Sequence, residues 1–239
     1  MVLTAIQLNH IDEAFKLKGY PKSNYFTVGY ELYMADHIDA AIDAFLRGAT
    51  NDSCVGCMFM YADIQSSERN NVHLALPFLL ESAFRGYVPS MAHLINRCYT
   101  KSKPARRAEA LKYHWGRMMI NFGDTQESEE EMKDRKKRNL NICIICEKNN
   151  SEDKKFEKCG NCKLYSYCGK NCQTRHWKKH ICECRQFMIL KEYCKPHYVR
   201  EIRDAIIGGV DPTEIPRLQT LRTKLGLNRP KKEYEELLL

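Results

Sequence analysis

Cysteine is distributed very unevenly along this chain. Nine of its twelve cysteines lie between Cys143 and Cys194. Within that stretch the candidate metal ligands form four pairs: Cys143-x2-Cys146, Cys159-x2-Cys162, Cys168-x3-Cys172 and His180-x3-Cys184. A CxxC turn lets two thiolates bind one ion, and an x3 spacing places two ligands on one face of a helical turn. The pattern predicts two closed tetrahedral zinc sites, one with four thiolates and one with three thiolates and an imidazole. Spacing alone leaves open whether neighbouring or alternate pairs share an ion.

Metal ligation is favoured over disulfides because the chain shows no sign of export. Residues 1–15 contain no basic start followed by an apolar run, as a secretory signal would. No uncharged apolar stretch approaches the roughly 18–20 residues that a membrane span needs. We therefore expect an intracellular protein of the cytoplasm or nucleus, with no membrane partner, in a compartment where thiols stay reduced and free to bind metal.

The role expected for the zinc is structural. A finger bounded by Cys143 and Cys184 holds few large apolar side chains, and domains this small cannot usually be stabilised by burial alone. Structural zinc in finger peptides contributes on the order of 10–16 kcal/mol per ion at neutral pH. With four protein ligands on each ion no position is left for a water molecule, so metal-assisted hydrolysis is not expected.

Residues 159–184 closely resemble the MYND-type zinc finger. The matching positions are Tyr167-Cys168, Cys172-Gln173, His176-Trp177 and His180-x3-Cys184. The resemblance implies that alternate pairs share an ion. The first zinc would then be bound by Cys143, Cys146, Cys168 and Cys172, and the second by Cys159, Cys162, His180 and Cys184.

The same resemblance implies protein binding. MYND fingers are interaction modules, several of which bind short proline-rich peptides, and their contacts correspond here to Gln173 and Trp177. An indole offers proline a flat apolar platform, and an amide can pair with a peptide backbone. The alternative is that Trp177 forms the small core of the finger. The chain also departs from better-studied binders, which carry Ser where it has Gly160-Asn161.

The remaining cysteines and a histidine have simpler interpretations. Cys54-x2-Cys57 has ligand spacing but no second pair beside it, so helix packing is expected. Cys182 could compete with Cys184 as a ligand, although the x3 spacing after His180 favours Cys184. His176 is surplus to eight ligands and is assigned a structural role.

Residues 1–123 are predicted to be an α-helical repeat region, and the whole chain to be mostly α, with a solenoid-like N-terminal part. The region 1–25 is weakly patterned. Helices are predicted at 27–35, 37–47, 54–64, 73–84, 89–99 and 104–122. A motif of an aromatic followed by a slim residue recurs at Phe45, Phe78 and Trp115, with helix-ending glycines at Gly86 and Gly123. The segment 75–99 resembles a Sel-one-like or tetratricopeptide-type unit; the alternative is an irregular helical bundle.

Two further segments complete the organisation. Residues 124–140 change from acidic to basic without an apolar stripe, and i,i+4 pairs such as Glu129–Lys133 predict a solvated helical spacer before the finger at 141–184. Residues 185–239 are predicted to be a helical tail. Its apolar stripe at Val199, Ile202 and Ile206 ends at Gly208, and the tail is expected to dock on the repeats or the finger.

The function expected is that of a protein-interaction adaptor without enzymatic activity. A formal net charge of +8 hints at acidic partners, but it counts every cysteine as neutral. Two zinc ions add four charges and seven thiolates remove seven, which leaves +5. Much of the basic composition therefore compensates the metal sites, and this weakens the case for nucleic acid.

Two alternatives remain from other classes. Lysines decorate the finger, which would suit a nucleic-acid-associated or transcription-regulating protein, although the ligand spacing is not that of a groove-reading finger. MYND fingers also occur inserted in SET-domain lysine methyltransferases. Such an enzyme needs a Gly-rich cofactor turn and an Asn-His-Ser-like segment, and the sequence contains neither.

Overall fold

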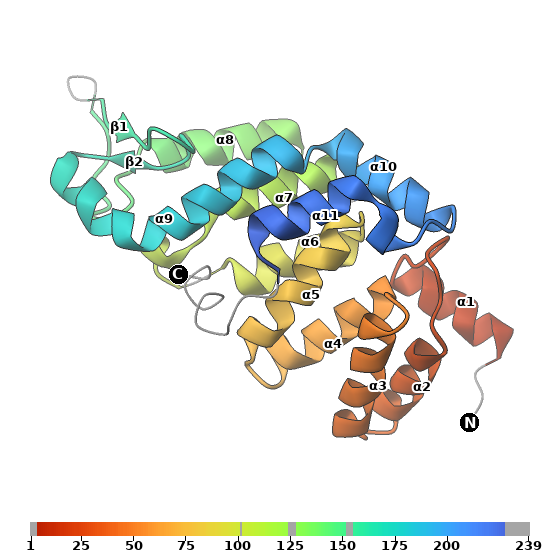
Figure 1. Cartoon of the computed structure of the whole chain (residues 1–239). Helices are drawn as coiled ribbons and strands as arrows, with labels where there is room; N and C mark the ends of the chain where they lie inside the picture. Colours follow the sequence, from red (N-terminus) through yellow and green to blue (C-terminus); the bar gives the residue numbers. More distant parts are fainter. Residues whose placement is uncertain (1–3, 101, 124–127, 152–154, 228–239) are drawn as a thin grey trace. The chain divides into compact units, whose positions relative to one another are not determined.

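The computed structural model describes residues 4–100, 102–123, 128–151 and 155–227. Within these residues the fold is mostly α-helical, as predicted, with a single short two-stranded sheet (Figure 1). The described residues fall into two compact units, the first made of residues 4–93 and 196–227, and the second of residues 94–195. Among the described residues every helix is too short or too polar to serve as a membrane span.

The first unit is built from helices alone. They are α1 (Ala5–Ala14), α2 (Asn24–Met34), α3 (Ile38–Thr50), α4 (Val55–Ser67), α5 (Val72–Phe84), α6 (Val88–His93), α10 (Pro196–Ile207), the 3-10 turn η3 (Pro212–Glu214) and α11 (Pro216–Leu225). From α2 to α6 each helix packs against the next along the chain. α4 has buried residues on almost every side, as expected of a helix covered by several neighbours.

Small residues let these helices approach closely. A Cβ at Gly48 of α3 would collide with the Cys57 sulfur of α4, because the thiol occupies the space where a side chain at position 48 would lie. Cys54 and Cys57 are both buried. This packing agrees with the interpretation of the CxxC sequence in this unit as part of a helix interface.

The predicted helices of this unit match the observed ones to within a few residues, but the sequence analysis missed α1. Thr4 caps that helix: its hydroxyl accepts from the Gln7 N–H, while the Gln7 side chain accepts from the Thr4 N–H at 2.9 Å. This is a capping box, and Thr followed three positions later by Gln is its sequence signal.

The C-terminal helices pack into the first unit. α10 buries Val199, Ile202 and Ile206, which are the residues of the predicted apolar stripe. A Cβ at Gly86, which has φ +83° after α5, would lie 3.0 Å from the Cβ of Arg203 on α10. The expectation that the tail docks on the N-terminal helices is therefore met.

The second unit contains the cysteine-rich region. Its elements are the π-helical turn η1 (Leu94–Cys98), the 3-10 turn η2 (Pro104–Arg106), α7 (Glu109–Asn121), α8 (Glu129–Leu140), β1 (Glu157–Lys158), β2 (Ser166–Tyr167) and α9 (Lys170–Tyr193). α7 packs against both α8 and α9. The single helix predicted at 104–122 is instead divided, because Arg107 adopts an extended conformation with ψ 136°.

The charged stretch is less isolated than the sequence predicts. α8 begins with a capping box formed by Ser128 and Glu131, and the predicted pair Glu129–Lys133 is present at 3.5 Å. However, Met132 is buried, and its Cε would lie 2.7 Å from a Cβ at Gly116. α8 thus packs on α7 rather than standing free in solvent. Residues 124–127 lie outside the described residues, and the predicted boundaries at 123 and 140 stay a prediction.

Candidate metal centre

Both CxxC turns close in the same way. The Glu147 N–H donates to the Cys143 carbonyl at 2.8 Å, and the Lys163 N–H donates to the Cys159 carbonyl at 3.1 Å. Glu147 and Lys163, each directly after its CxxC pair, have φ of 59° and 56°. This left-handed residue turns the chain back, so that both thiols of a pair face the same point.

A short strand brings the two turns together. In β2, Ser166 pairs with Lys158 of β1, which directly precedes Cys159. Ser166 also forms an isolated parallel bridge with Cys143. β2 therefore lies between the segments that carry the first and second CxxC pairs, and it runs directly into Cys168. This strand pairing is the local reason why the ligand pairs alternate between two sites.

The first cluster contains Cys143, Cys146, Cys168 and Cys172, whose sulfur atoms all lie within 4.8 Å of one another. The Sγ atoms of Cys146 and Cys168 are 3.5 Å apart, as are those of Cys168 and Cys172. Tetrahedral zinc with Zn–S bonds of about 2.3 Å requires sulfurs about 3.8 Å apart, so the cluster fits this ion. Burial would raise the pKa of Cys143, but N–H donors from the same turn and from Cys168 lower it to about 6, which favours the thiolate.

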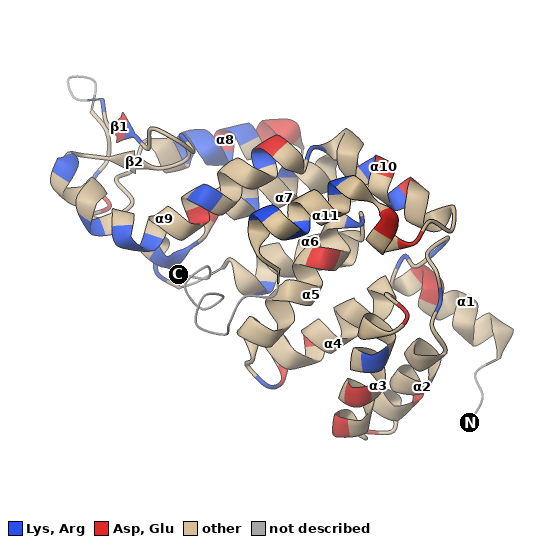
Figure 2. Ribbon diagram, viewed as in Figure 1, with Lys and Arg blue, Asp and Glu red and all other residues tan. Residues whose placement is uncertain are grey.

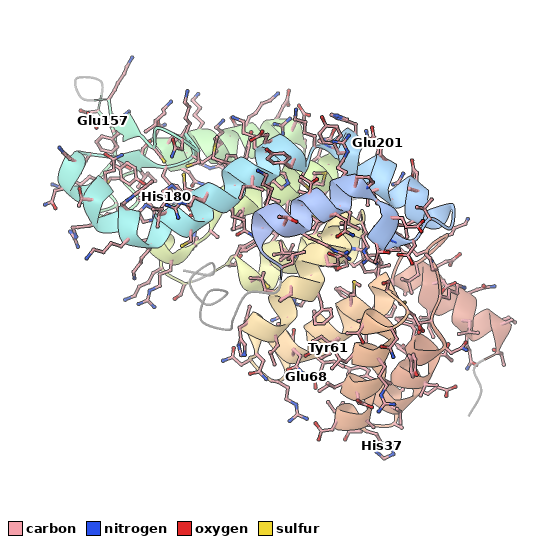
Figure 3. All side chains as sticks on the ribbon, viewed as in Figure 1. His37, Tyr61, Glu68, Glu157, His180 and Glu201 are labelled. Atoms are coloured by element: carbon pink, nitrogen blue, oxygen red, sulfur yellow. The ribbon has the colours of Figure 1, made fainter. Side chains whose placement is uncertain are left out.

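The second cluster contains Cys159, Cys162, His180 and Cys184, and all four are buried. The His180 Nε2 lies 3.4 Å from each of the Cys159 and Cys162 sulfurs, and the Cys159 and Cys184 sulfurs are 3.8 Å apart. Figure 3 labels His180 on α9, the helix that also carries Cys172 and Cys184. The structure thus assembles the alternate-pair ligand sets that the family resemblance implies.

His180 is oriented by a buried carboxylate that the sequence analysis missed. The Glu183 Oε2 lies 2.9 Å from the His180 Nδ1, so the imidazole Nε2 is directed at the three sulfurs. Glu183 also accepts from the Tyr165 hydroxyl at 2.8 Å and from the Ala110 N–H at 2.8 Å. A carboxylate behind a zinc-binding histidine fixes the ring and raises its basicity. The signal in the sequence was a Glu three residues after His on a helix, which places both on one face.

The same carboxylate caps α7. Ala108, the residue before this helix, provides no side-chain cap. Instead, two residues of the finger accept from the first two N–H groups of α7. The Glu109 N–H donates to the Tyr165 hydroxyl at 2.8 Å, and the Ala110 N–H donates to the Glu183 carboxylate. An anion at a helix N-terminus is favoured by the free N–H groups and by the helix dipole. The start of α7 is therefore set by the finger.

His176 is not a ligand in either cluster. Its ring stacks on that of His180, with centroids 5.0 Å apart and an interplanar angle of 4°, and its Nδ1 lies 3.0 Å from the Tyr167 hydroxyl. Burial lowers the pKa of His176 to about 4, so it is neutral at physiological pH. These contacts support the structural role assigned to it.

Replacing Glu183 by Ala is expected to weaken zinc binding at the second site by about 10–100-fold, because His180 loses its orienting partner. Competition with a chromophoric chelator measures this affinity. Glu183→Gln keeps an acceptor for the imidazole N–H, so its loss should be smaller. Glu192→Gln is the matched control, since Glu192 is exposed on the same helix. Unchanged affinity in Glu183→Ala would contradict a role through His180.

The two predicted peptide contacts lie one turn apart on α9. Trp177 is 38% exposed, and its ring meets that of His180 edge-on with centroids 6.1 Å apart. It therefore covers the second zinc site from outside and does not form the interior of the finger. A groove runs beside it, lined by Asn161, Trp177, Ile181, Cys184, Arg185, Met188 and Ile189. Gln173 is partly buried and does not line this groove.

Comparison with known families identifies this region. The family model described as the MYND finger matches residues 143–184. A SET and MYND domain-containing protein of Dictyostelium discoideum is 45% identical over 47 residues, which are 18% of this chain and 9% of that protein. N-lysine methyltransferase SMYD2-B of Danio rerio is 38% identical over 53 residues, which are 22% of this chain and 12% of that protein.

These similarities are local. The matched region spans about a tenth of the length of the curated relatives. No solved structure matches the chain significantly. The family match, the ligand spacing and the two assembled clusters agree with one another. Residues 143–184 are therefore a MYND-type zinc finger with two zinc-binding sites, one of four cysteines and one of three cysteines and a histidine.

Proposed function

We propose that this chain is a protein-interaction adaptor whose finger binds short proline-rich peptides along α9. MYND fingers are protein-interaction modules, and the observation that carries the finer proposal is the groove beside Trp177. Its apolar residues Trp177, Ile181 and Met188 follow one another at helical spacing along one face of α9. Trp177 and Met188 are 38% and 37% exposed, so they are accessible to a ligand.

The chemistry of the groove suits an extended proline-containing peptide. The indole gives proline rings an apolar platform, and the exposed Asn161 and Arg185 at the rim can pair with peptide carbonyls. Because Cys184 also lines the groove, zinc binding fixes its floor. Gly160 does not line the groove, so the absence of Ser at this position leaves the lining residues unchanged.

The helices of the first unit are proposed as a second interaction surface. Each of α2 to α5 packs on the next, which is consistent with Sel-one-like or tetratricopeptide-type stacking. Phe45 is buried and Gly86 takes the left-handed conformation after α5, as the repeat pattern requires. A catalytic role is not proposed, because four protein ligands on each zinc leave no position for substrate or water. We propose a reducing compartment, cytoplasm or nucleus, because the two zinc sites need seven thiolates.

The test is a binding titration between the full zinc-loaded chain and a fluorescent PxLxP-type peptide, with fluorescence anisotropy as the readout. Trp177→Ala should weaken binding by about thirtyfold or more, since an aromatic hot spot is worth at least about 2 kcal/mol. Leu74→Ala is the matched control: Leu74 is 40% exposed, similar to Trp177, but lies on α5 in the first unit. Its affinity should not change.

The proposal fails if the wild-type chain does not bind the peptide, or if Trp177→Ala binds as well as wild type. Zinc content must be equal in all variants, so that a lost site is not mistaken for a lost contact. Gln173→Ala in the same assay shows whether the neighbouring turn of α9 extends the site.

A further inference from the structure

A second groove in the finger-containing unit has a different character. It lies between α8, the N-terminal half of α7 and the segment around β1, and it shares no residue with the groove beside Trp177. Lys133, Lys136 and Lys137 of α8 line one side, and Lys155 and Lys158 line the other. Figure 2 colours the Lys and Arg positions blue, and they recur along the ribbon of α8.

Among the described residues, three of these five lysines have no acidic partner and can meet an external negative charge. Lys133 pairs with Glu129 at 3.5 Å, and the Lys136 ammonium lies 5.2 Å from the centre of the Tyr113 ring. Within the described part of the chain, Lys137, Lys155 and Lys158 have no acidic partner within salt-bridge distance, and no acidic residue lines the groove. A concave surface with one sign of charge concentrates its field and attracts ligands of the opposite sign.

The groove also has apolar and hydrogen-bonding features. Phe156 and Leu140 are partly buried and line it between the lysines. Asn150 lines it too, and its Oδ1 is buried without a hydrogen-bond partner among the described residues. An acceptor left unpaired in this way requires a donor. A peptide N–H is a donor, whereas the phosphodiester of a nucleic-acid backbone offers only acceptors.

The distribution of charge favours a short ligand over a long polyanion. No arginine lines the groove in the described residues, so it lacks the fork that binds phosphate with two parallel hydrogen bonds. α8 begins with Glu129, Glu130 and Glu131, which would repel a nucleic-acid backbone continuing along the helix. The groove presents separate ammonium groups with apolar surface between them. This arrangement is complementary to a peptide in which carboxylates alternate with apolar side chains.

We propose that this groove binds a short acidic peptide segment with interspersed apolar residues, supplied by a partner protein. Carboxylates would pair with Lys137, Lys155 and Lys158, an apolar side chain would lie on Phe156, and a backbone N–H would donate to Asn150. The chain then has an acidic-peptide site in addition to the proposed proline-rich one, and the two sites can be occupied independently because they share no residue.

The experiment uses the full zinc-loaded chain and a fluorescein-labelled peptide of alternating Glu and Phe, at low salt, with anisotropy as the readout. Lys137→Glu/Lys158→Glu should bind about tenfold more weakly or worse, because two attractive contacts become repulsive. Lys178→Glu/Lys179→Glu is the control: both lysines are exposed on α9 outside the groove, and the change in net charge is identical. It should bind like wild type.

Peptide variants and a competitor complete the test. A peptide with Gln for Glu should not bind, and one with Ser for Phe should bind more weakly at equal charge. An equal loss in both double variants would overturn the proposal, since binding would then follow net charge alone. Displacement of the peptide by single-stranded DNA at or below the concentration of unlabelled peptide would also overturn it, as would an absence of wild-type binding.

Discussion

Removal of zinc with EDTA is expected to unfold residues 143–184 and to leave the first unit folded. Each structural zinc contributes on the order of 10–16 kcal/mol, which is comparable with the whole stability of a small domain, about 5–15 kcal/mol. The first unit has its own buried core, including Phe45, Leu76 and Leu79, and no ligand residue belongs to it. Amide hydrogen exchange measures the two regions separately.

The effect should extend beyond the finger at one place. Glu109 and Ala110, at the start of α7, lose the acceptors that Tyr165 and Glu183 provide, so their amides should exchange faster as well. EDTA preloaded with zinc is the control, and native mass spectrometry should count two zinc ions per chain before treatment. Fewer than two ions, or loss of protection in the first unit together with the finger, would contradict this account.

Loss of the Glu81 charge should strongly destabilise the first unit. Glu81 of α5 is buried and accepts from Arg85 Nε at 2.8 Å and from Arg222 Nε of α11 at 2.8 Å. Glu81→Gln removes the carboxylate that both guanidinium groups contact, which leaves only the more distant charge of Asp211 near them, and Arg85 is fully buried. Breaking a buried charge pair in this way costs about 3–5 kcal/mol.

Urea denaturation followed by hydrogen exchange in α5 measures this loss. Glu201→Gln is the control: Glu201, labelled in Figure 3, forms an exposed pair with Arg217 at 3.4 Å, and such pairs contribute about 0–1 kcal/mol. A loss at Glu81 no larger than that at Glu201 would show that the buried network does not hold α11 on α5.

The Glu81 network also predicts a pH dependence. Burial alone would raise the pKa of Glu81, but Arg222 and Arg85 outweigh it and lower the pKa below its ordinary value of 4.5. A carboxyl with a lowered folded-state pKa stabilises the fold above its unfolded-state pKa, and this contribution is lost as the pH falls through the folded-state pKa. The acid limb of the stability curve should therefore be shallower in Glu81→Gln than in wild type.

The metal centre was the most predictable part of this molecule. Eight ligands at fixed spacing identify a two-zinc finger, because zinc accepts few residue types and a tetrahedral site limits their separation. The spacing of the ligands alone did not show that alternate pairs share an ion. This arrangement depends on Ser166, which pairs with both Cys143 and Lys158 of β1. Such strand pairing cannot be predicted from the spacing of the ligands.

Helix ends were predictable where local residues set them. Gly86 and Gly123 follow α5 and α7 in the left-handed conformation, as predicted, and the capping box at Thr4 could have revealed α1. The start of α7 could not be found locally, since Glu183, 73 positions beyond Ala110, caps it. Met132 shows a related limit, because a single buried apolar residue in an otherwise charged helix gives no stripe in the sequence, yet α8 packs on α7.

The most direct test of the proposed function is a heteronuclear NMR titration of the zinc-loaded, ¹⁵N-labelled chain with an unlabelled PxLxP-type peptide. The account predicts that shifts concentrate at the Trp177 indole N–H and at the amides of Ile181 and Met188 on α9, while resonances of the first unit stay unchanged. An absence of shifts at high peptide concentration, or shifts confined to residues outside the α9 groove, would contradict it.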